Sequence, residues 1–226
     1  RFFSYDKEKF LSRNRFIKKN TTEYNLIKKL YRKNKKLLII ENEYASILTK
    51  AKNEADKCPV KMGGMSNINL IYNLAINHKP KIILETGVAY GWSSLSFLLA
   101  IKFNKFGKLF SIDMPYPSLN NEKYVGCVIP DELKNEWNLL KMPDQIAIPS
   151  VLQKVSNIDM CHYDSDKSYE GRKWAYPKLW ESLNEKGIFI SDDISDNRAF
   201  EDFVNQINKN PYIIQYNDQY LGIIIK

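Results

Sequence analysis

Five short apolar segments between residues 81 and 193 constrain the fold of this chain more than any other feature of its sequence. They are KIILE (81–85), KLFSID (108–113), WNLLK (137–141), IDMCHYD (158–164) and GIFISDD (187–193), and helical stretches or loops separate them. Segments that are apolar on both faces are typical of parallel strands covered by helices on both sides. We therefore expect a doubly wound α/β sheet over this part of the chain.

The C-terminal residues follow a different pattern. PYIIQYNDQYLGIIIK (211–226) contains two strand-like runs joined by the turn residues Asn217 and Asp218, which predicts a β-hairpin. A nicotinamide-binding Rossmann domain would instead continue with alternating strands and helices to its sixth strand. The expected fold is therefore α/β, with a doubly wound, mainly parallel seven-stranded sheet that ends in an antiparallel C-terminal hairpin.

The N-terminal quarter is basic, and its apolar spacing predicts helices. Residues 1–57 contain 16 Lys or Arg against 7 Asp or Glu, and the remainder contains 18 against 19, so this segment supplies the net charge of +8. A basic segment can bind nucleic acid, anionic lipid or an acidic substrate. No recognisable nucleic-acid motif accompanies these lysines, and a solvated helical face is the simpler interpretation.

Pro59 and the pair Gly63 and Gly64 interrupt the helical pattern. We therefore divide the chain into a basic helical N-terminal extension (1–62) and a main domain (63–226). Ser66 is the expected cap of a helix that runs through NINLIYNLAIN.

Cysteine content and hydropathy indicate the compartment. The three cysteines, Cys58, Cys127 and Cys161, are odd in number and lie far apart in the sequence, which fits reduced thiols. No apolar run approaches the roughly 18 to 20 residues that a membrane span needs. We expect a cytoplasmic protein with no membrane partner.

A glycine-bearing loop follows the first predicted strand. In ETGVAYGWSS (85–94), Gly87 and Gly91 allow a sharp turn and a close approach to a ligand, and Ser93 opens the next helix. The spacing differs from the G-x-G-x-x-G dinucleotide fingerprint. The following strand ends in Asp113, whose carboxylate can accept hydrogen bonds from both hydroxyls of a ribose. We expect a nucleotide-containing cofactor here.

Four of the five predicted strands end in acid: Glu85, Asp113, Asp164 and the pair Asp192 and Asp193. The carboxyl ends of parallel strands meet at one edge of the sheet, where ligands bind. Carboxylates gathered there repel one another unless a cation neutralises them. Their hard oxygens suit Mg²⁺ or Ca²⁺, and we expect a divalent cation held by Asp164, Asp192 and Asp193. His162 lies within an apolar run, so we expect a core histidine rather than a ligand.

Two stretches carry a family resemblance. Residues 85–91 resemble motif I, E-x-G-x-x-x-G, of the class I S-adenosylmethionine (SAM)-dependent methyltransferases, whose seven-stranded sheet also ends in an antiparallel hairpin. DSDKSYEG (164–171), followed by NEKGIFISDDI (184–194), is similar to the cation-dependent small-molecule O-methyltransferases. These include the catechol and caffeoyl-coenzyme A types and bacterial enzymes that methylate sugar hydroxyls. The resemblance covers roughly residues 66–226.

The resemblance implies an enzyme that transfers a methyl group from SAM to a hydroxyl of a small molecule. It places Asp164, Asp192 and Asp193 on the metal and makes Lys167 the general base, provided that the metal and the sulfonium depress the pKa of the lysine. Lys167 resembles the catechol type, whereas SYEG resembles the sugar type, and we expect a sugar or glycoconjugate acceptor. The residues expected to bind the cofactor are Glu85, Gly87, Tyr90, Gly91, Ser93, Asp113 and Asp144.

Other interpretations of these residues remain open at the level of sequence. Lys167 could be a solvated lysine paired with Asp166 or Glu170, and the acids at 192–193 could cap the next helix, although Asp196 could serve that purpose. A nucleic-acid methyltransferase could use the basic helices as its phosphate footprint. This chain lacks the [N/D]-P-P-[Y/F/W] motif of base-directed enzymes, so we do not expect nucleic acid as a partner. A non-catalytic cofactor-binding scaffold is the third alternative. We expect the N-terminal helices to form a homodimer interface or a lid.

Overall fold

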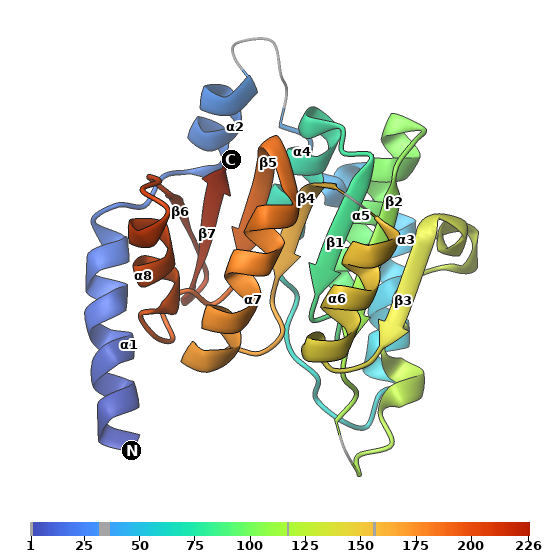
Figure 1. Ribbon diagram of the computed structural model, residues 1–226. Coiled ribbons are helices and arrows are strands. Elements are labelled where there is room, and N and C mark those ends of the chain that lie inside the picture. The colour runs from blue at the N-terminus through green and yellow to red at the C-terminus, as the bar shows by residue number, and fades with distance from the viewer. Residues whose placement is uncertain (1, 32–36, 117, 156) are drawn as a thin grey trace.

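The computed structural model describes residues 2–31, 37–116, 118–155 and 157–226, and its centre is a single seven-stranded sheet (Figure 1). In spatial order the sheet is β3-β2-β1-β4-β5-β7-β6. The strands are β1 (Ile82–Thr86), β2 (Lys108–Asp113), β3 (Trp137–Lys141), β4 (Ile158–Tyr163), β5 (Leu183–Ser191), β6 (Tyr212–Tyr216) and β7 (Gln219–Ile225).

The pairing confirms the fold expected from the sequence. Strands β1 to β5 pair in parallel, whereas β7 pairs antiparallel with both β5 and β6. The chain runs outward from β1 to β3 and then crosses back to β4 beside β1, so the strand order reverses between β1 and β4. In open α/β sheets, ligands bind outside the carboxyl ends of the strands at this reversal.

Helices cover both faces of the sheet (Figure 1). One face carries α6 (Asp144–Lys154), α7 (Tyr169–Ser182) and α8 (Ala199–Gln206), and the other carries α3 (Ile40–Asp56), α4 (Ile68–His78) and α5 (Trp92–Asn104). The remaining elements are α1 (Phe2–Ile17), α2 (Glu23–Tyr31) and two short 3₁₀ turns, η1 (Glu122–Tyr124) and η2 (Asp131–Glu136).

Each face has its own apolar core. On the α4–α5 side, Leu70, Phe97 and Leu109 are completely buried, and Leu26 and Ile27 of α2 belong to the same cluster. The opposite cluster is rich in aromatic residues of α7, α8 and β5, which pack edge to face. Burial on both faces explains why the strands read as continuous apolar runs.

The N-terminal helices pack against the main domain. Ile40 and Ala51 of α3 are buried in the same cluster as α4, whereas α1 lies along the β6 edge, where the amide of Thr21 donates to the carbonyl oxygen of Ile213 at 2.8 Å. The boundary at residue 62 stays a prediction. The helix cap differs from the expected one, because the side chain of Asn67, not Ser66, accepts from the amide of Leu70.

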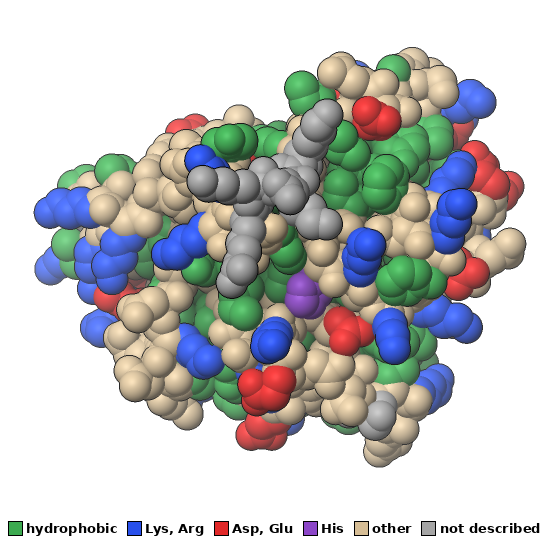
Figure 2. Space-filling model, turned by 90° about the horizontal axis from the view of Figure 1, so that it is seen from above, with side chains coloured by type: hydrophobic (Ala, Val, Ile, Leu, Met, Phe, Trp, Pro, Cys, Tyr) green, Lys and Arg blue, Asp and Glu red, His purple; other side chains and the backbone are tan. Residues whose placement is uncertain are grey.

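Three basic side chains of α1 form ion pairs with the main domain. The pairs are Lys9 with Asp196, Arg13 with Asp218 and Arg15 with Glu201, at 2.9, 3.6 and 3.0 Å. Figure 2 shows the face at the amino-terminal end of the parallel strands, where Lys and Arg side chains are scattered among apolar and polar groups. In the described parts of the chain, no helix has the length and apolar character that crossing a membrane requires.

Candidate active site

A pocket of about 450 Å³ opens at the carboxyl ends of β1, β2, β4 and β5. It lies at the reversal of strand order, where the acids of these strand ends were expected to meet. Asp113, Asp144, Asp164, Asp192 and Asp193 all line it, and so do Gly87, Ser93 and Lys167. The structure therefore gathers into one cavity side chains that lie up to 106 residues apart in the sequence.

The glycine loop forms one wall of this pocket. Gly87 has a φ of 82°, and a Cβ atom at this position would overlap the carbonyl oxygen of Asp164. Only glycine allows the loop after β1 to lie this close to the segment after β4. Gly91, with a φ of 98°, begins α5, and Ser93 in the first turn of this helix is buried beside the pocket.

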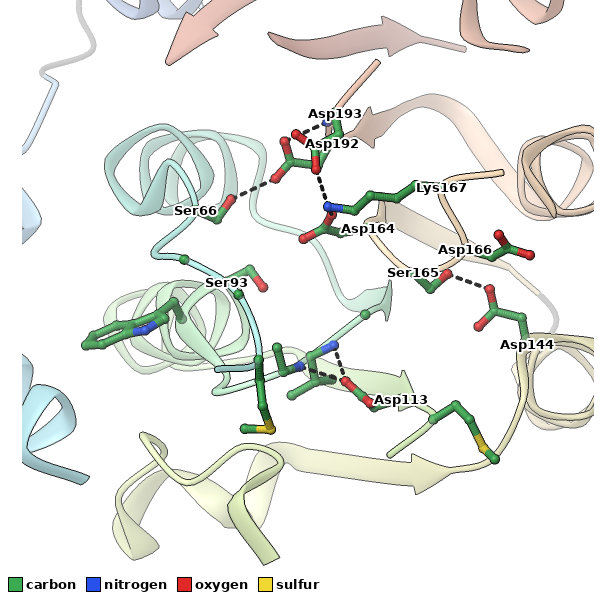
Figure 3. Close-up of a pocket in the computed structure, with 18 of the residues that line it drawn as sticks. Ser66, Ser93, Asp113, Asp144, Asp164, Ser165, Asp166, Lys167, Asp192 and Asp193 are labelled. Carbon is green, nitrogen blue, oxygen red and sulfur yellow. Dashed lines mark hydrogen bonds and ion pairs between the residues drawn. The ribbon is translucent and has the colours of Figure 1, made fainter. Parts of the chain in front are cut away.

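Asp113 orders the glycine loop. Its Oδ2 accepts hydrogen bonds from the backbone amides of Val88 and Ala89 at 2.7 and 2.6 Å, as Figure 3 shows. These bonds use only Oδ2, so Oδ1 can accept from a ligand in the pocket. Burial raises the pKa of Asp113, although the two amide hydrogen bonds partly oppose this shift.

Glu85 and Tyr90 occupy positions that differ from those expected. Glu85 is completely buried beneath the loop, where its Oε2 accepts from the hydroxyls of Ser94 and Ser111, and it is not part of the pocket wall. The Tyr90 hydroxyl donates to the carbonyl oxygen of Val60 at 3.1 Å and accepts from the amide of Met62 at 3.2 Å. Both residues therefore lie behind the pocket wall, and their contribution to cofactor binding stays a prediction.

The far end of the pocket carries Asp144, the first residue of α6. Its Oδ2 accepts a hydrogen bond from the Ser165 hydroxyl, and Ser165 also contacts Thr86 Oγ1 at 2.9 Å. Burial raises the pKa of Asp144. This network fixes the loop after β4 against α6, which places Asp144 on the same side of the pocket as Asp113 (Figure 3).

The other end of the pocket holds an acid cluster, which we define as Asp164, Asp192 and Asp193. The ammonium of Lys167 lies between two of its members, 3.0 Å from Asp164 Oδ1 and in contact with Asp193 Oδ2 (Figure 3). Asp192 Oδ2 accepts a hydrogen bond from the Ser66 hydroxyl at 3.2 Å. Lys167 is thus paired inside the site and not with Asp166 or Glu170.

The cluster shifts the protonation of its members. Burial, together with the negative charge of Asp192, raises the pKa of Asp164 to about 7, although Lys167 opposes this shift. Burial and the neighbouring Asp193 raise the pKa of Asp192. Burial alone would lower the pKa of Lys167, but its two carboxylate partners outweigh this effect and raise it. The lowered lysine pKa that a general base requires is therefore not a property of this arrangement.

The metal prediction has no direct support in the geometry. Over the residues that the structure describes, no group of three or more His, Cys, Asp or Glu side chains is arranged to hold a metal ion. Asp164 and Asp193 close around an ammonium instead. His162 is completely buried, with its Nδ1 3.6 Å from Glu85 Oε1, and is a core residue as expected.

One wall of the pocket is not predictable from the motifs above. Residues 62–66, between α3 and α4, line the cavity, and so does Gln219 at the start of β7. As a sequence pattern, the Gly63–Gly64 pair predicts only a break in the helical spacing. A glycine pair flanked by Met62 and Met65 could have suggested a segment that lies across a ligand site.

Comparisons with known proteins fit this geometry. Residues 84–194 match the model of a family described as a methyltransferase domain. No curated protein is similar enough in sequence to match. An O-methyltransferase from Bacillus cereus in complex with SAH has a TM-score of 0.62 and 11% identity, over 83% of this chain and 95% of that one.

Two further structures show the same fold. TomG from Streptomyces achromogenes, an O-methyltransferase involved in tomaymycin synthesis and solved with SAM, gives a TM-score of 0.65 at 14% identity, covering 83% of this chain and 96% of its own. The SAH-bound Podospora anserina methyltransferase PaMTH1 gives 0.59 at 14%, covering 90% and 93%. The matched segment contains the glycine loop, Asp113 and the acid cluster, so the part of the chain that resembles a methyltransferase domain is the part that builds the pocket, and the fold is the one seen in these SAM- and SAH-bound methyltransferases.

Proposed function

We propose that this protein is a SAM-dependent O-methyltransferase that acts on a hydroxyl of a small molecule, with sugars and glycoconjugates as the first acceptors to test. The observation that carries the proposal is the division of one pocket into two chemically distinct ends. One end, with Asp113 and Asp144, offers carboxylates to a nucleoside, and the other offers the acid cluster and Lys167 to a polar acceptor.

The nucleoside end suits the polar groups of SAM. Asp113 Oδ1 can accept a hydrogen bond from a ribose hydroxyl, because Oδ2 is held by the glycine loop. The loop glycines bring the backbone close to the ligand, and the first turn of α5 presents amide groups and Ser93. We propose that Asp144, which lines the same side of the pocket as Asp113, accepts from the adenine amino group.

Methyl transfer breaks the bond between sulfur and the methyl carbon, forms a bond from that carbon to the acceptor oxygen, and releases the hydroxyl proton. The pocket must therefore hold oxygen, carbon and sulfur in line and provide a proton acceptor next to the oxygen. Lys167 and the acid cluster are the titratable groups at the acceptor end of the pocket. While its ammonium is bound by Asp164 and Asp193, Lys167 orients an acceptor as a donor.

The donor set of the acid cluster fits a divalent cation. Three carboxylates supply only hard oxygens, which suit Mg²⁺, and the position between Asp164 and Asp193 already holds a positive charge. A divalent cation held there would lower the pKa of an acceptor hydroxyl. The ammonium and the metal would compete for these oxygens, so Asp164, Asp192 and Asp193 would hold the metal, and Lys167 would be a proton acceptor only where it is not bound by these carboxylates.

The test is calorimetric titration of SAM into the wild type and Asp113→Ala, with Mg²⁺ and with EDTA. Methyl transfer from labelled SAM to a panel of sugars and catechols follows. We expect SAM to bind, Asp113→Ala to lose most of the affinity, and transfer to require the divalent ion. Transfer that persists in EDTA would remove the metal from the proposal. A wild type that binds no SAM would refute the enzyme proposal itself.

No observation favours nucleic acid as the acceptor. Lys9, Arg13 and Arg15 of α1 are engaged with Asp196, Asp218 and Glu201, so these cations are not free to follow a phosphate backbone. The homodimer also stays a prediction. The α1 helix exposes 63% of Phe10, 46% of Leu11 and 51% of Ile17, and light scattering that reports a monomer would refute dimerisation through this helix.

A further inference from the structure

Arg172, in the first turns of α7, carries a charge that is completely buried. Its side chain has no exposed surface, and it is the largest fully buried side chain among the described residues. A charged group removed from water is costly unless good partners compensate for its lost hydration. The partners of Arg172 therefore indicate what the residue does.

Those partners are two consecutive main-chain carbonyls. The Nη2 atom of Arg172 donates to the carbonyl oxygens of Asp192 and Asp193 at 3.2 and 3.0 Å. The other two nitrogens, Nε and Nη1, have no hydrogen-bond partner among the residues that the structure describes. A buried guanidinium that forms hydrogen bonds through only one of its three nitrogens gains little stability to offset its desolvation.

The two carbonyls belong to the turn in which β5 ends. Asp193 adopts a left-handed conformation there, with a φ of 48°, which is uncommon for a residue with a side chain and costs about 1 kcal/mol or more. Because both carbonyl oxygens point toward Arg172, the peptide planes of this turn are fixed. The two carboxylates extend into the pocket instead, toward Ser66 and Lys167 (Figure 3).

The segment after β5 and the start of α7 both contact the loop after β4. The Asn197 side chain, just after the turn, donates to the carbonyl oxygen of Lys167 at 2.8 Å. A Cβ atom on Gly171 would overlap the Asp166 carboxylate, so glycine permits this loop to pack on the helix. One helical turn therefore holds the two segments that carry the acid cluster.

From these contacts we infer that Arg172 is a positioning residue for the proposed methyl transfer, on which this inference rests. It touches neither end of the pocket, and it acts by holding Asp192 and Asp193 in the one backbone conformation that aims both carboxylates at the acceptor end. Its loss leaves the cofactor end intact, because the loop ordered by Asp113 lies on other strands.

The experiment compares Arg172→Met and Arg172→Lys with the wild type. Methionine keeps most of the buried volume without the charge, so a residue that only fills the core would tolerate it. Lysine keeps the charge but lacks the planar fork, so it restores part of the function. Lys173→Gln, an exposed change on the same helical turn, is the matched control.

Hydrogen exchange followed by mass spectrometry reports the turn directly. In both Arg172 variants we expect residues 191–197 to exchange about tenfold faster or more, with residues 85–94 unchanged. The affinity for SAM should stay within about threefold of the wild type in both variants, while kcat falls about a hundredfold in Arg172→Met and less in Arg172→Lys, because the acceptor groups are misplaced. Lys173→Gln should match the wild type in all three measurements.

Unchanged exchange at 191–197 in Arg172→Lys, the variant expected to fold in any case, would overturn the inference. So would a loss of SAM affinity equal to the loss in kcat, since that pattern indicates general disruption. The proposed function fails separately, if the wild type binds no SAM or transfers no methyl group. The exchange comparison remains decisive for Arg172 in that event, because it needs neither ligand.

Discussion

Replacement of Asp113 tests how the cofactor end of the pocket works. Its Oδ2 accepts from two backbone amides of the glycine loop, and its Oδ1 is available to a ribose hydroxyl. Hydrogen bonds to a charged group contribute about 1.5 to 3 kcal/mol each. In Asp113→Ala the cofactor loses its own bond and must also order a looser loop. We expect a loss of about 3 kcal/mol, or roughly a hundredfold in Kd.

Asp113→Asn removes the negative charge of this side chain and keeps its shape. The amide oxygen can still accept from the loop amides, but the second acceptor becomes a donor, so we expect about a tenfold loss of SAM affinity. Burial raises the pKa of Asp113 in the free protein. The affinity of the wild type should therefore fall as the pH decreases through that raised pKa and the carboxylate becomes protonated. Asp113→Asn should show no such decline.

Calorimetry at several pH values measures both effects, and Asp131→Asn is the control. Asp131 is 94% exposed and pairs only with Lys134 on the surface, so its loss should leave the affinity unchanged. Asp113→Ala that binds SAM within threefold of the wild type would refute the assigned role. If Asp113→Asn lost thermal stability in proportion to its loss of SAM affinity, the result would instead indicate a structural role for this residue.

Three further substitutions test the glycine loop, Asp159 of β4 and Lys167 of the pocket. Gly87→Ala places a methyl group at a residue with a positive φ and against the Asp164 carbonyl, so the free energy of unfolding in urea should fall by about 2 kcal/mol or more. Gly64→Ala is the control, because no atom lies within 4 Å of the new methyl group, and its free energy of unfolding should stay within about 0.5 kcal/mol of the wild type. Asp159 accepts three hydrogen bonds that outweigh the effect of burial and lower its pKa. The stability that it contributes is therefore complete above its unfolded pKa of about 3.9 and is lost as the pH falls further. Asp159→Asn should remove this pH dependence in urea titrations from pH 7 to pH 3. Lys167→Gln leaves two carboxylates without their cation and should lower stability in EDTA by about 1 kcal/mol, a modest value because 40% of the side chain is exposed. Mg²⁺ should restore the lost stability in thermal melts, and a variant that shows no recovery with Mg²⁺ would contradict the cation site.

The sheet was predictable because each parallel strand is buried on both faces and the two hairpin strands flank a recognisable turn. The apolar run KLFSID, for example, was placed at 108–113 and forms β2 over the same residues. The acids that follow these runs were predictable as one group for the same reason. Strand ends are fixed by the sheet, and the sheet is fixed by the apolar pattern.

Side-chain partners were less predictable, because they depend on which way each residue faces. Ser66 is a good helix cap by type, but the neighbouring Asn67 takes this position and Ser66 turns to Asp192. Glu85 precedes the glycine loop in sequence but points into the core beneath it. The partners proposed for Lys167 lay close in sequence, whereas Asp193, one of its actual partners, comes from the neighbouring strand.

The acid cluster shows why these partners matter for function. Its carboxylates share one ammonium, that of Lys167, whereas the guanidinium of Arg172 contacts the main chain of the same turn. The two cations are held differently. Arg172 is completely buried beneath the turn, bound only to main-chain oxygens, and has no path away from it. Lys167 lies on the pocket side with 40% of its side chain exposed, so it can leave. A divalent ion in its place would bring a second positive charge to oxygens that now share one ammonium. Arg172 therefore fixes the shape of the turn, and under the proposed function the position between Asp164 and Asp193, which the ammonium of Lys167 now occupies, is the one that a divalent ion would take.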